Sequence, residues 1–285
     1  MEGGPGTMIR VGIIDSQEET MITTYHRPKT LDEALTLLDQ PNTLPLGGGT
    51  LLSTPTTDPV QAVDLQLLGL DTITPLGNSP STGSGQRLEL GSTLTLQSLL
   101  ESEHCPEALK SALKLEAPLN LRNAATLAGT LVACDGRSTF ATALLALDAK
   151  LTIIVDRQSQ IVNLGDFLPL RPRGLITSIA IPLNVKLAFE YVSRTPADKP
   201  IVCAALAQWN SGRTRLAVGG YGKSPMLAMD GTESEGADAS SADAVLRSAQ
   251  AAARNAFHEA ADEWASADYR MDVAATLAKR CLEGI

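Results

Sequence analysis

Cysteine, histidine and aromatic residues are scarce in this sequence of 285 residues. Its four cysteines form no CxxC or CxH pair, which argues against a disulfide framework, a structural zinc site and an iron–sulfur cluster held by this chain alone. The three histidines lie in unrelated segments and no GxSxG motif occurs, so a hydrolytic triad has no support. The cysteines are therefore expected to be reduced, mostly buried thiols.

Basic tracts and long apolar runs are missing as well. A net charge of −9 without a basic tract argues against nucleic-acid binding. No apolar run approaches the roughly 20 residues that span a bilayer. The first twenty residues lack the charged and apolar blocks of a signal peptide, which predicts a cytoplasmic protein. A hydrophobic content of 44% with 19% charged residues is typical of a globular chain with room for two domains.

Two apparent motifs fail on inspection. The run GGYGKS at 219–224 resembles a P-loop, but Ala217 stands where the first glycine belongs and Pro225 where the helix should begin. The run His258-Glu-Ala-Ala-Asp262 differs from HExxH at its second histidine, which favours a solvated helix face. The sequence therefore offers no nucleophile, no metal cage and no acid–base pair.

Helix and strand patterns alternate in the first part of the chain and give way to consecutive strands after Pro182. Thr30 and Glu33 form a capping box that opens a helix over 31–39. The first part further predicts strands at 44–46, 61–65, 87–91, 151–155 and 175–181, helices at 95–103, 106–116 and 140–149, and an edge-like segment at 161–167. The last part predicts an antiparallel meander at 187–192, 201–209 and 214–218, then helices at 242–263 and 268–283.

Two glycine-bearing loops are the candidates for chemistry. Gly47 to Thr50 directly follow a strand, where backbone amides can wrap a phosphate because glycine has no Cβ in the way. An ordinary strand-ending turn is an equally good interpretation, and the GxGxxG fingerprint is absent. Small residues also crowd 124–129, which fits either tight packing or close approach to a ligand. Together the loops suggest a large cofactor held between two lobes.

Five collinear segments then resemble one family. They are YHRPKTLDEAL, LPLGGGTLLS, RNAATLAGTLVACDGRSTFATALLALDAKL, RLAVGGYGKSPMLA and WASADYRMDVAATLAKRCLE. The second is similar to an AGGT-type loop and the third to an RNxATIGGN…DLAPALLALDA segment. On these segments the chain is identified as a member of the FAD-binding (medium) subunits of the xanthine dehydrogenase and carbon monoxide dehydrogenase family of molybdenum hydroxylases. The resemblance covers about 20–285.

The resemblance implies an α+β fold with two parts. The first is a two-lobed FAD-binding domain of the PCMH (vanillyl-alcohol oxidase-like) type over 21–182, with lobes at about 21–76 and 77–182. The second is a C-terminal domain over 183–285, with a three-stranded antiparallel sheet and helices. Residues 1–20 would be an N-terminal extension.

The resemblance also implies which residues hold the cofactor. Two loops would wrap the FAD pyrophosphate through backbone amides, namely Leu46, Gly47, Gly48, Gly49, Thr50, Leu51 and Leu52 from the first lobe and Thr126, Leu127, Ala128, Gly129 and Thr130 from the second. Thr139 stands where the family has an aspartate, and the strand at Ile176 would lie beside the flavin ring. No catalytic residue and no metal ligand is expected on this chain.

An electron-transfer function follows from the resemblance. A large molybdopterin subunit would oxidise the substrate, a small subunit with 2Fe–2S clusters would relay electrons, and this chain would pass them through FAD to an external acceptor, in a dimer of heterotrimers. Ala128, Thr130 and Thr139 depart from the family pattern, and the lost carboxylate could weaken FAD binding by about 1–2 kcal/mol. An FAD-deficient paralogue that acts as an assembly scaffold is the alternative. A stand-alone FAD oxidoreductase would need substrate residues that the sequence does not offer.

Overall fold

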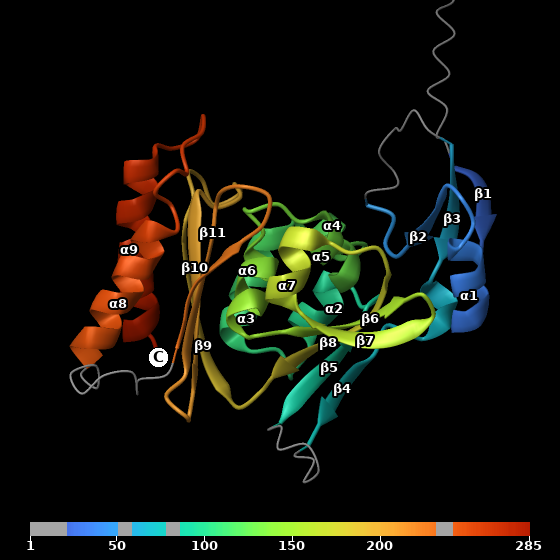
Figure 1. Cartoon of the computed structure of the whole chain (residues 1–285), viewed down its shortest axis with the longest axis horizontal. Helices are drawn as coiled ribbons and strands as arrows, with labels where there is room; N and C mark the ends of the chain where they lie inside the picture. Colours follow the sequence, from blue (N-terminus) through green and yellow to red (C-terminus); the bar gives the residue numbers. More distant parts are fainter. Residues whose placement is uncertain (1–21, 51–58, 78–85, 232–241) are drawn as a thin grey trace, which may run out of the picture.

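Three sheets with their own helices lie side by side along the molecule (Figure 1). The computed structural model describes residues 22–50, 59–77, 86–231 and 242–285. The N-terminal sheet lies at one end, the C-terminal sheet at the other, and a five-stranded sheet with most of the helices lies between them (Figure 1). The chain order of the three sheets therefore matches their order in space.

The first lobe is a parallel sheet with one helix. Its elements are β1 (Ile22–His26), α1 (Leu31–Leu38), β2 (Thr43–Leu46) and β3 (Val60–Asp64), with β3 in the centre of the order β1-β3-β2. The capping box is confirmed, because Thr30 Oγ1 accepts the amide of Glu33 at 3.3 Å and Glu33 accepts the amide of Lys29 at 2.9 Å. Parallel strands end at a common edge, so Gly47 begins the loop at the carboxyl edge of this sheet.

The second lobe is an antiparallel sheet covered by helices. Its strands are β4 (Ile73–Leu76), β5 (Arg87–Gly91), β6 (Lys150–Val155), β7 (Gln158–Asn163) and β8 (Leu175–Pro182), in the order β4-β5-β8-β6-β7. The short helix η1 (Gln66–Leu68) connects the lobes, and the covering helices are α2 (Leu96–Glu101), α3 (Glu107–Glu116), α4 (Leu119–Arg122), α5 (Leu127–Ala133), α6 (Thr139–Ala146) and α7 (Leu164–Leu170). Every residue of α6 is buried, as expected of a helix rich in alanine and leucine.

Two details of this lobe differ from the sequence prediction. Strand β4 pairs with β5, so the second sheet begins before residue 77. The segment 161–167 is not one edge strand, because β7 ends at Asn163 and α7 begins at Leu164. Pro169 lies inside α7, and a proline there makes a helix hard to predict from local preference.

The C-terminal sheet lies between two layers of helices. Its strands are β9 (Val185–Val192), β10 (Val202–Trp209), β11 (Thr214–Gly219) and β12 (Met226–Gly231), all antiparallel in the order β12-β11-β10-β9. Helices α8 (Ala242–Asn255) and α9 (Ala267–Glu283) pack on one face, and α6 of the second lobe packs on the other (Figure 1). Ala205, Ala207 and Ala217 belong to the same hydrophobic core as α6.

This sheet corrects the expected number of strands, which was three. The fourth strand, β12, has the sequence MLAMDG and lacks the β-branched residues that mark a strand, so only its pairing with β11 reveals it. Helix α8 also ends at Asn255 rather than at 263, and His258 lies in the turn that follows it.

The predicted burial of the cysteines is confirmed. Cys105, Cys134, Cys203 and Cys281 are all buried and free. Burial raises the pKa of the Cys134 thiol to about 11 and that of the Cys203 thiol to about 12, so both are neutral near pH 7. None of the helices in the described ranges is long and apolar enough to cross a membrane.

Candidate functional site

The two glycine-bearing loops meet at the junction of the first and second lobes. A Cβ atom at Gly47 would lie 2.7 Å from Thr126 Oγ1, and one at Gly48 would lie 1.6 Å from the carbonyl oxygen of Ala124. Both distances are too short for a side chain. Glycine is therefore required at these positions because the second loop already occupies the space.

A cavity of about 520 Å³ opens where the loops meet. Its size lies within the roughly 300–1,000 Å³ of small-molecule sites. Its lining residues are Gly47, Gly48, Gln66, Asp71, Thr93, Leu94, Thr95, Ser98, Asn123, Ala124 and Thr126. Since this lining includes no lysine or arginine, a phosphate group held here would depend on uncharged donors: backbone amides, hydroxyl groups and the side-chain amides of Gln66 and Asn123.

The first loop has amides suited to that task. Among the described residues, no acceptor is recorded for the amide of Gly47 or of Gly48. Gly49 has φ of 74°, in the left-handed region that favours glycine. Leu46 ends β2, and its carbonyl accepts the amide of Leu65 at 3.0 Å. The first loop therefore has backbone amides of the kind that the predicted phosphate contact would need.

Two predicted residues of this loop, Leu51 and Leu52, lie outside the described residues. Thr50 is exposed at the end of the described segment and does not line the cavity. The structure thus brings Gly47 and Gly48 to the cavity wall, with Leu46 behind them.

The second loop uses its amides internally. The amide of Leu127 donates to Leu94 O at 2.8 Å, and that of Ala128 donates to Ser92 O at 3.1 Å. Thr126 is the N-cap of α5 and accepts the amides of Gly129 and Thr130. The amide of Gly129 donates to Thr126 Oγ1 at 3.3 Å, and the amide of Thr130 donates to Thr126 O at 2.9 Å. Capture of a phosphate by these four amides would require those bonds to break.

The residues just before α5 line the cavity. Asn123, Ala124 and Thr126 line it, whereas Leu127 is buried in the core. The backbone role predicted for Thr126 stays a prediction, and the structure places its hydroxyl 2.7 Å from where a Cβ of Gly47 would lie.

Thr139 and Ile176 do not line this cavity. Thr139 is fully buried in the first turn of α6, and its hydroxyl donates to Ala112 O at 2.7 Å. Ile176 is 5% exposed within the core between β8 and the helices. Of the predicted site residues, the structure brings Gly47, Gly48 and Thr126 together at the cavity, and Thr139 and Ile176 lie away from it.

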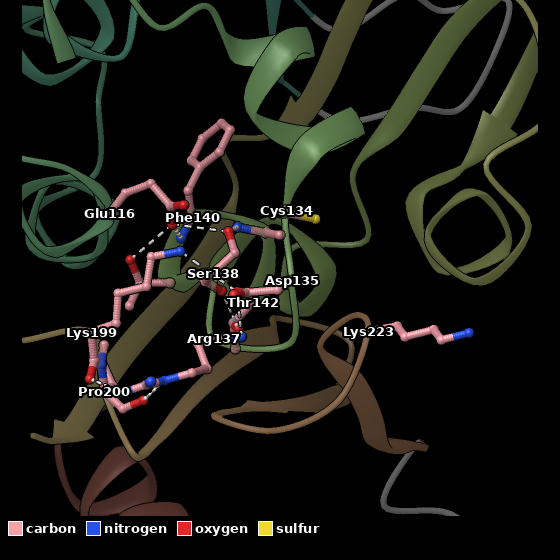
Figure 2. A network of polar contacts seen from close by, with 12 residues as sticks. Glu116, Cys134, Asp135, Arg137, Ser138, Phe140, Thr142, Lys199, Pro200 and Lys223 are labelled. Carbon is pink, nitrogen blue, oxygen red and sulfur yellow. Dashed lines mark hydrogen bonds and ion pairs between the residues drawn. The ribbon is translucent and has the colours of Figure 1, made fainter. Parts of the chain in front are cut away.

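Glu116 was missed by the sequence analysis. Its carboxylate lies at the start of α6, where it accepts hydrogen bonds from Ser138 Oγ at 2.9 Å and from the amide of Phe140 at 2.9 Å (Figure 2). It also accepts one from Thr139 Oγ1 at 3.2 Å. An anion at a helix N-terminus accepts hydrogen bonds from amides that have no partner within the helix, and it is attracted by the positive end of the helix dipole. Glu116 thus supplies a carboxylate close to position 139, where the family pattern has an aspartate. Its place at the end of amphipathic α3 resembles an ordinary surface residue, so local sequence gave no signal.

Glu116→Gln is expected to lower the free energy of unfolding by about 1–3 kcal/mol, because it replaces a charged acceptor of three hydrogen bonds with a neutral amide. Thr139→Asp alone should also destabilise, since a second carboxylate would lie beside Glu116. The double variant should recover part of both losses. Urea unfolding of the four proteins measures this coupling, and strictly additive effects would contradict it.

The irregular segment Cys134 to Thr139 docks on the C-terminal domain. Gly136 donates its amide to Gly222 O at 2.9 Å and accepts the amide of Gly220 at 2.6 Å. Arg137 donates from Nε to Pro200 O at 3.1 Å and from Nη2 to Lys199 O at 2.6 Å (Figure 2). These contacts explain why this part of the second loop lacks a regular pattern: its partners lie in the other domain.

Comparison with known proteins places the chain in a family. A family model described as the FAD binding domain in molybdopterin dehydrogenase matches residues 18–184, and one described as the CO dehydrogenase flavoprotein C-terminal domain matches residues 187–285. The fold and the loops thus define a flavoprotein subunit of an oxidoreductase. The chain belongs to the family of FAD-binding subunits of the molybdenum hydroxylases, whose cofactor is FAD.

Individual proteins are also similar to this chain. The uncharacterized protein YgfM of Escherichia coli (strain K12) is 30% identical over 205 residues, which cover 70% of this chain and 75% of that protein. The reconstituted CO dehydrogenase from Oligotropha carboxidovorans aligns with a TM-score of 0.75 at 24% identity, over 91% of this chain and 96% of that chain. Quinoline 2-oxidoreductase from Pseudomonas putida 86 gives 0.72 at 21% identity, over 92% and 95%. At these identities the solved structures establish a shared fold.

Proposed function

We propose that this chain is the FAD-carrying electron-transfer subunit of a molybdenum-hydroxylase-type complex. In this function it receives electrons from 2Fe–2S clusters on a small subunit and passes them through FAD to an external acceptor. The observation that carries the proposal is the cavity at the lobe junction, where Gly47 and Gly48 present amides without an acceptor among the described residues. FAD supplies the redox chemistry when bound, and the protein supplies its position and surroundings.

The residues of the junction have separate tasks in this proposal. Gly47 and Gly48 hold the pyrophosphate through their amides. Asn123 and Thr126, which line the cavity, form the opposite wall, and the backbone contacts of 126–130 with the pyrophosphate stay predictions. The predicted contact of the Ile176 strand with the flavin ring, and the contributions of Leu51 and Leu52, stay predictions.

The partners follow from the family. We expect a large subunit with molybdopterin, where substrate is oxidised, and a small subunit with 2Fe–2S clusters, assembled as a dimer of heterotrimers in the cytoplasm. Support comes from similar solved structures, one titled a Cu,Mo-CO dehydrogenase and another a CO dehydrogenase from Hydrogenophaga pseudoflava that lacks the Mo-pyranopterin moiety of the molybdenum cofactor.

The deciding experiment is a visible spectrum of the purified chain after incubation with FAD and gel filtration. We expect flavin absorbance to co-elute with the protein. A chain that elutes colourless after incubation would reject the FAD function. Co-purification with a larger molybdenum-containing chain tests the assembly separately, and its absence would favour a stand-alone oxidoreductase.

One observation favours the second candidate, an FAD-deficient scaffold. The amides of Leu127, Ala128, Gly129 and Thr130 all have acceptors within the chain, so the second loop is complete without a ligand. A scaffold would co-purify with the molybdenum subunit while remaining colourless. The two measurements above therefore separate the two functions.

A further inference from the structure

Arg171 connects three segments that are distant in the sequence. It follows α7 with φ of 42° and ψ of 60°, in the left-handed region. Its guanidinium donates to Val132 O at 2.9 Å, to Lys223 O at 2.9 Å and to the carbonyl of Cys134. Its Nε donates back to Leu168 O at 3.3 Å. One side chain thus joins the ends of α7 and α5 to the C-terminal domain.

The contacts of Arg171 with Val132 and Cys134 fix one end of α5. The last carbonyls of a helix have no hydrogen-bond partner within the helix. A cation there donates to them and is attracted by the negative end of the helix dipole. The other end of α5 is Thr126, which touches Gly47 at the cavity. Because α5 spans only Leu127–Ala133, a shift at one end moves the other.

The contact with Lys223 reaches the C-terminal domain. Lys223 is bound through its carbonyl, and its side chain points away from the polar network (Figure 2). The same glycine-rich turn bonds Gly136 through Gly220 and Gly222. The turn at 219–224, which resembled a P-loop in the sequence, is therefore the part of the C-terminal domain that Arg171 and Gly136 contact.

We infer that Arg171 is a positioning residue for FAD, and that it couples the cofactor cavity to the C-terminal domain through α5. The inference rests on the proposed function. Arg171 keeps Thr126 against Gly47 and so sets the distance between the two walls of the cavity. Coupling between sites is reciprocal, so FAD bound at the cavity also tightens the turn at 219–224.

The test uses Arg171→Asn, since asparagine tolerates the left-handed conformation while the guanidinium is removed. Arg157→Asn is the matched control: Arg157 has φ of 61°, and its side chain pairs with exposed Asp39 at 2.9 Å, away from α5. FAD affinity is measured by titration of flavin fluorescence. We expect binding at least tenfold weaker in Arg171→Asn and within twofold of the native value in Arg157→Asn.

Amide hydrogen exchange separates coupling between the two regions from a general loss of stability in the variant. In the native chain, FAD should slow exchange of amides both at Gly47 and Gly48 and at 219–224. In Arg171→Asn at saturating FAD, protection should remain at the glycines and disappear at 219–224. If that variant does not fold, Arg171→Lys replaces it, because one ammonium cannot reach all three carbonyls, and binding at least threefold weaker is expected.

Unchanged FAD affinity together with unchanged protection at 219–224 would overturn the inference while leaving the FAD function intact. A native chain that does not bind FAD would overturn both. The titration of the native protein therefore distinguishes the two failures.

Discussion

Replacing Gly48 with alanine is expected to lower the free energy of unfolding by about 3 kcal/mol and to abolish FAD retention. The new Cβ would lie 1.6 Å from the carbonyl oxygen of Ala124, so the backbone of one loop must move away from the other. Because the two loops form the cavity walls, this movement changes the site as well as the packing. Urea unfolding and the flavin absorbance of the purified variant measure the two effects.

Gly231→Ala is the matched control for this change. It is also a glycine-to-alanine substitution, but a Cβ there meets no described atom within 4 Å. Its stability and flavin content should equal those of the native chain. A Gly48→Ala protein with native stability and full flavin content would mean that the loops do not meet as described.

Arg270→Met should be the most damaging change in the C-terminal domain. Arg270 is fully buried, donates to Ala260 O at 2.6 Å and Ala265 O at 2.9 Å, and pairs with Asp262 at 2.7 Å. Methionine is apolar and shorter, and it leaves these acceptors without the donors that Arg270 supplies. Leaving a buried acceptor such as Ala260 O without a donor costs about 1–3 kcal/mol, and loss of the ion pair with the solvent-accessible Asp262 adds to this. Chemical denaturation followed by circular dichroism measures the loss.

Arg280→Met provides the comparison, since Arg280 is exposed on the same helix, α9. Its free energy of unfolding should change by no more than about 0.5 kcal/mol. Equal stabilities of the two variants would show that the hydrogen bonds of Arg270 contribute little to the domain.

Local signals predicted much of the fold. The strand at 87–91 and the helix capped by Thr30 were predicted correctly. The alternation of apolar residues, their helical spacing and the capping residues all depend on positions close together in the sequence. Strand β12 was missed because its residues have weak strand preference and only the edge of β11 makes them a strand. Pairing between distant segments is not a local property of the sequence.

The same distinction applies to the candidate site. The run of glycines pointed to Gly47 and Gly48, because two backbones can approach closely only where a residue has no Cβ, and glycine is visible in the sequence. Nothing near Ala128 indicated that Ser92 would accept its amide, and nothing near Thr139 indicated that Glu116 would lie beside it. These partners come from segments more than twenty residues away and meet only in the folded chain.

Helix α6 has a consequence for how this family's two modules are joined. The family models divide the chain between residues 184 and 187, yet α6 contributes to a hydrophobic core that includes Ala205 and Ala217 from the C-terminal sheet. A fragment ending at the division would expose one side of a helix that has no polar face. The hydrophobic core therefore crosses the boundary between the family models, and the FAD-binding module depends on its neighbour to complete its interior.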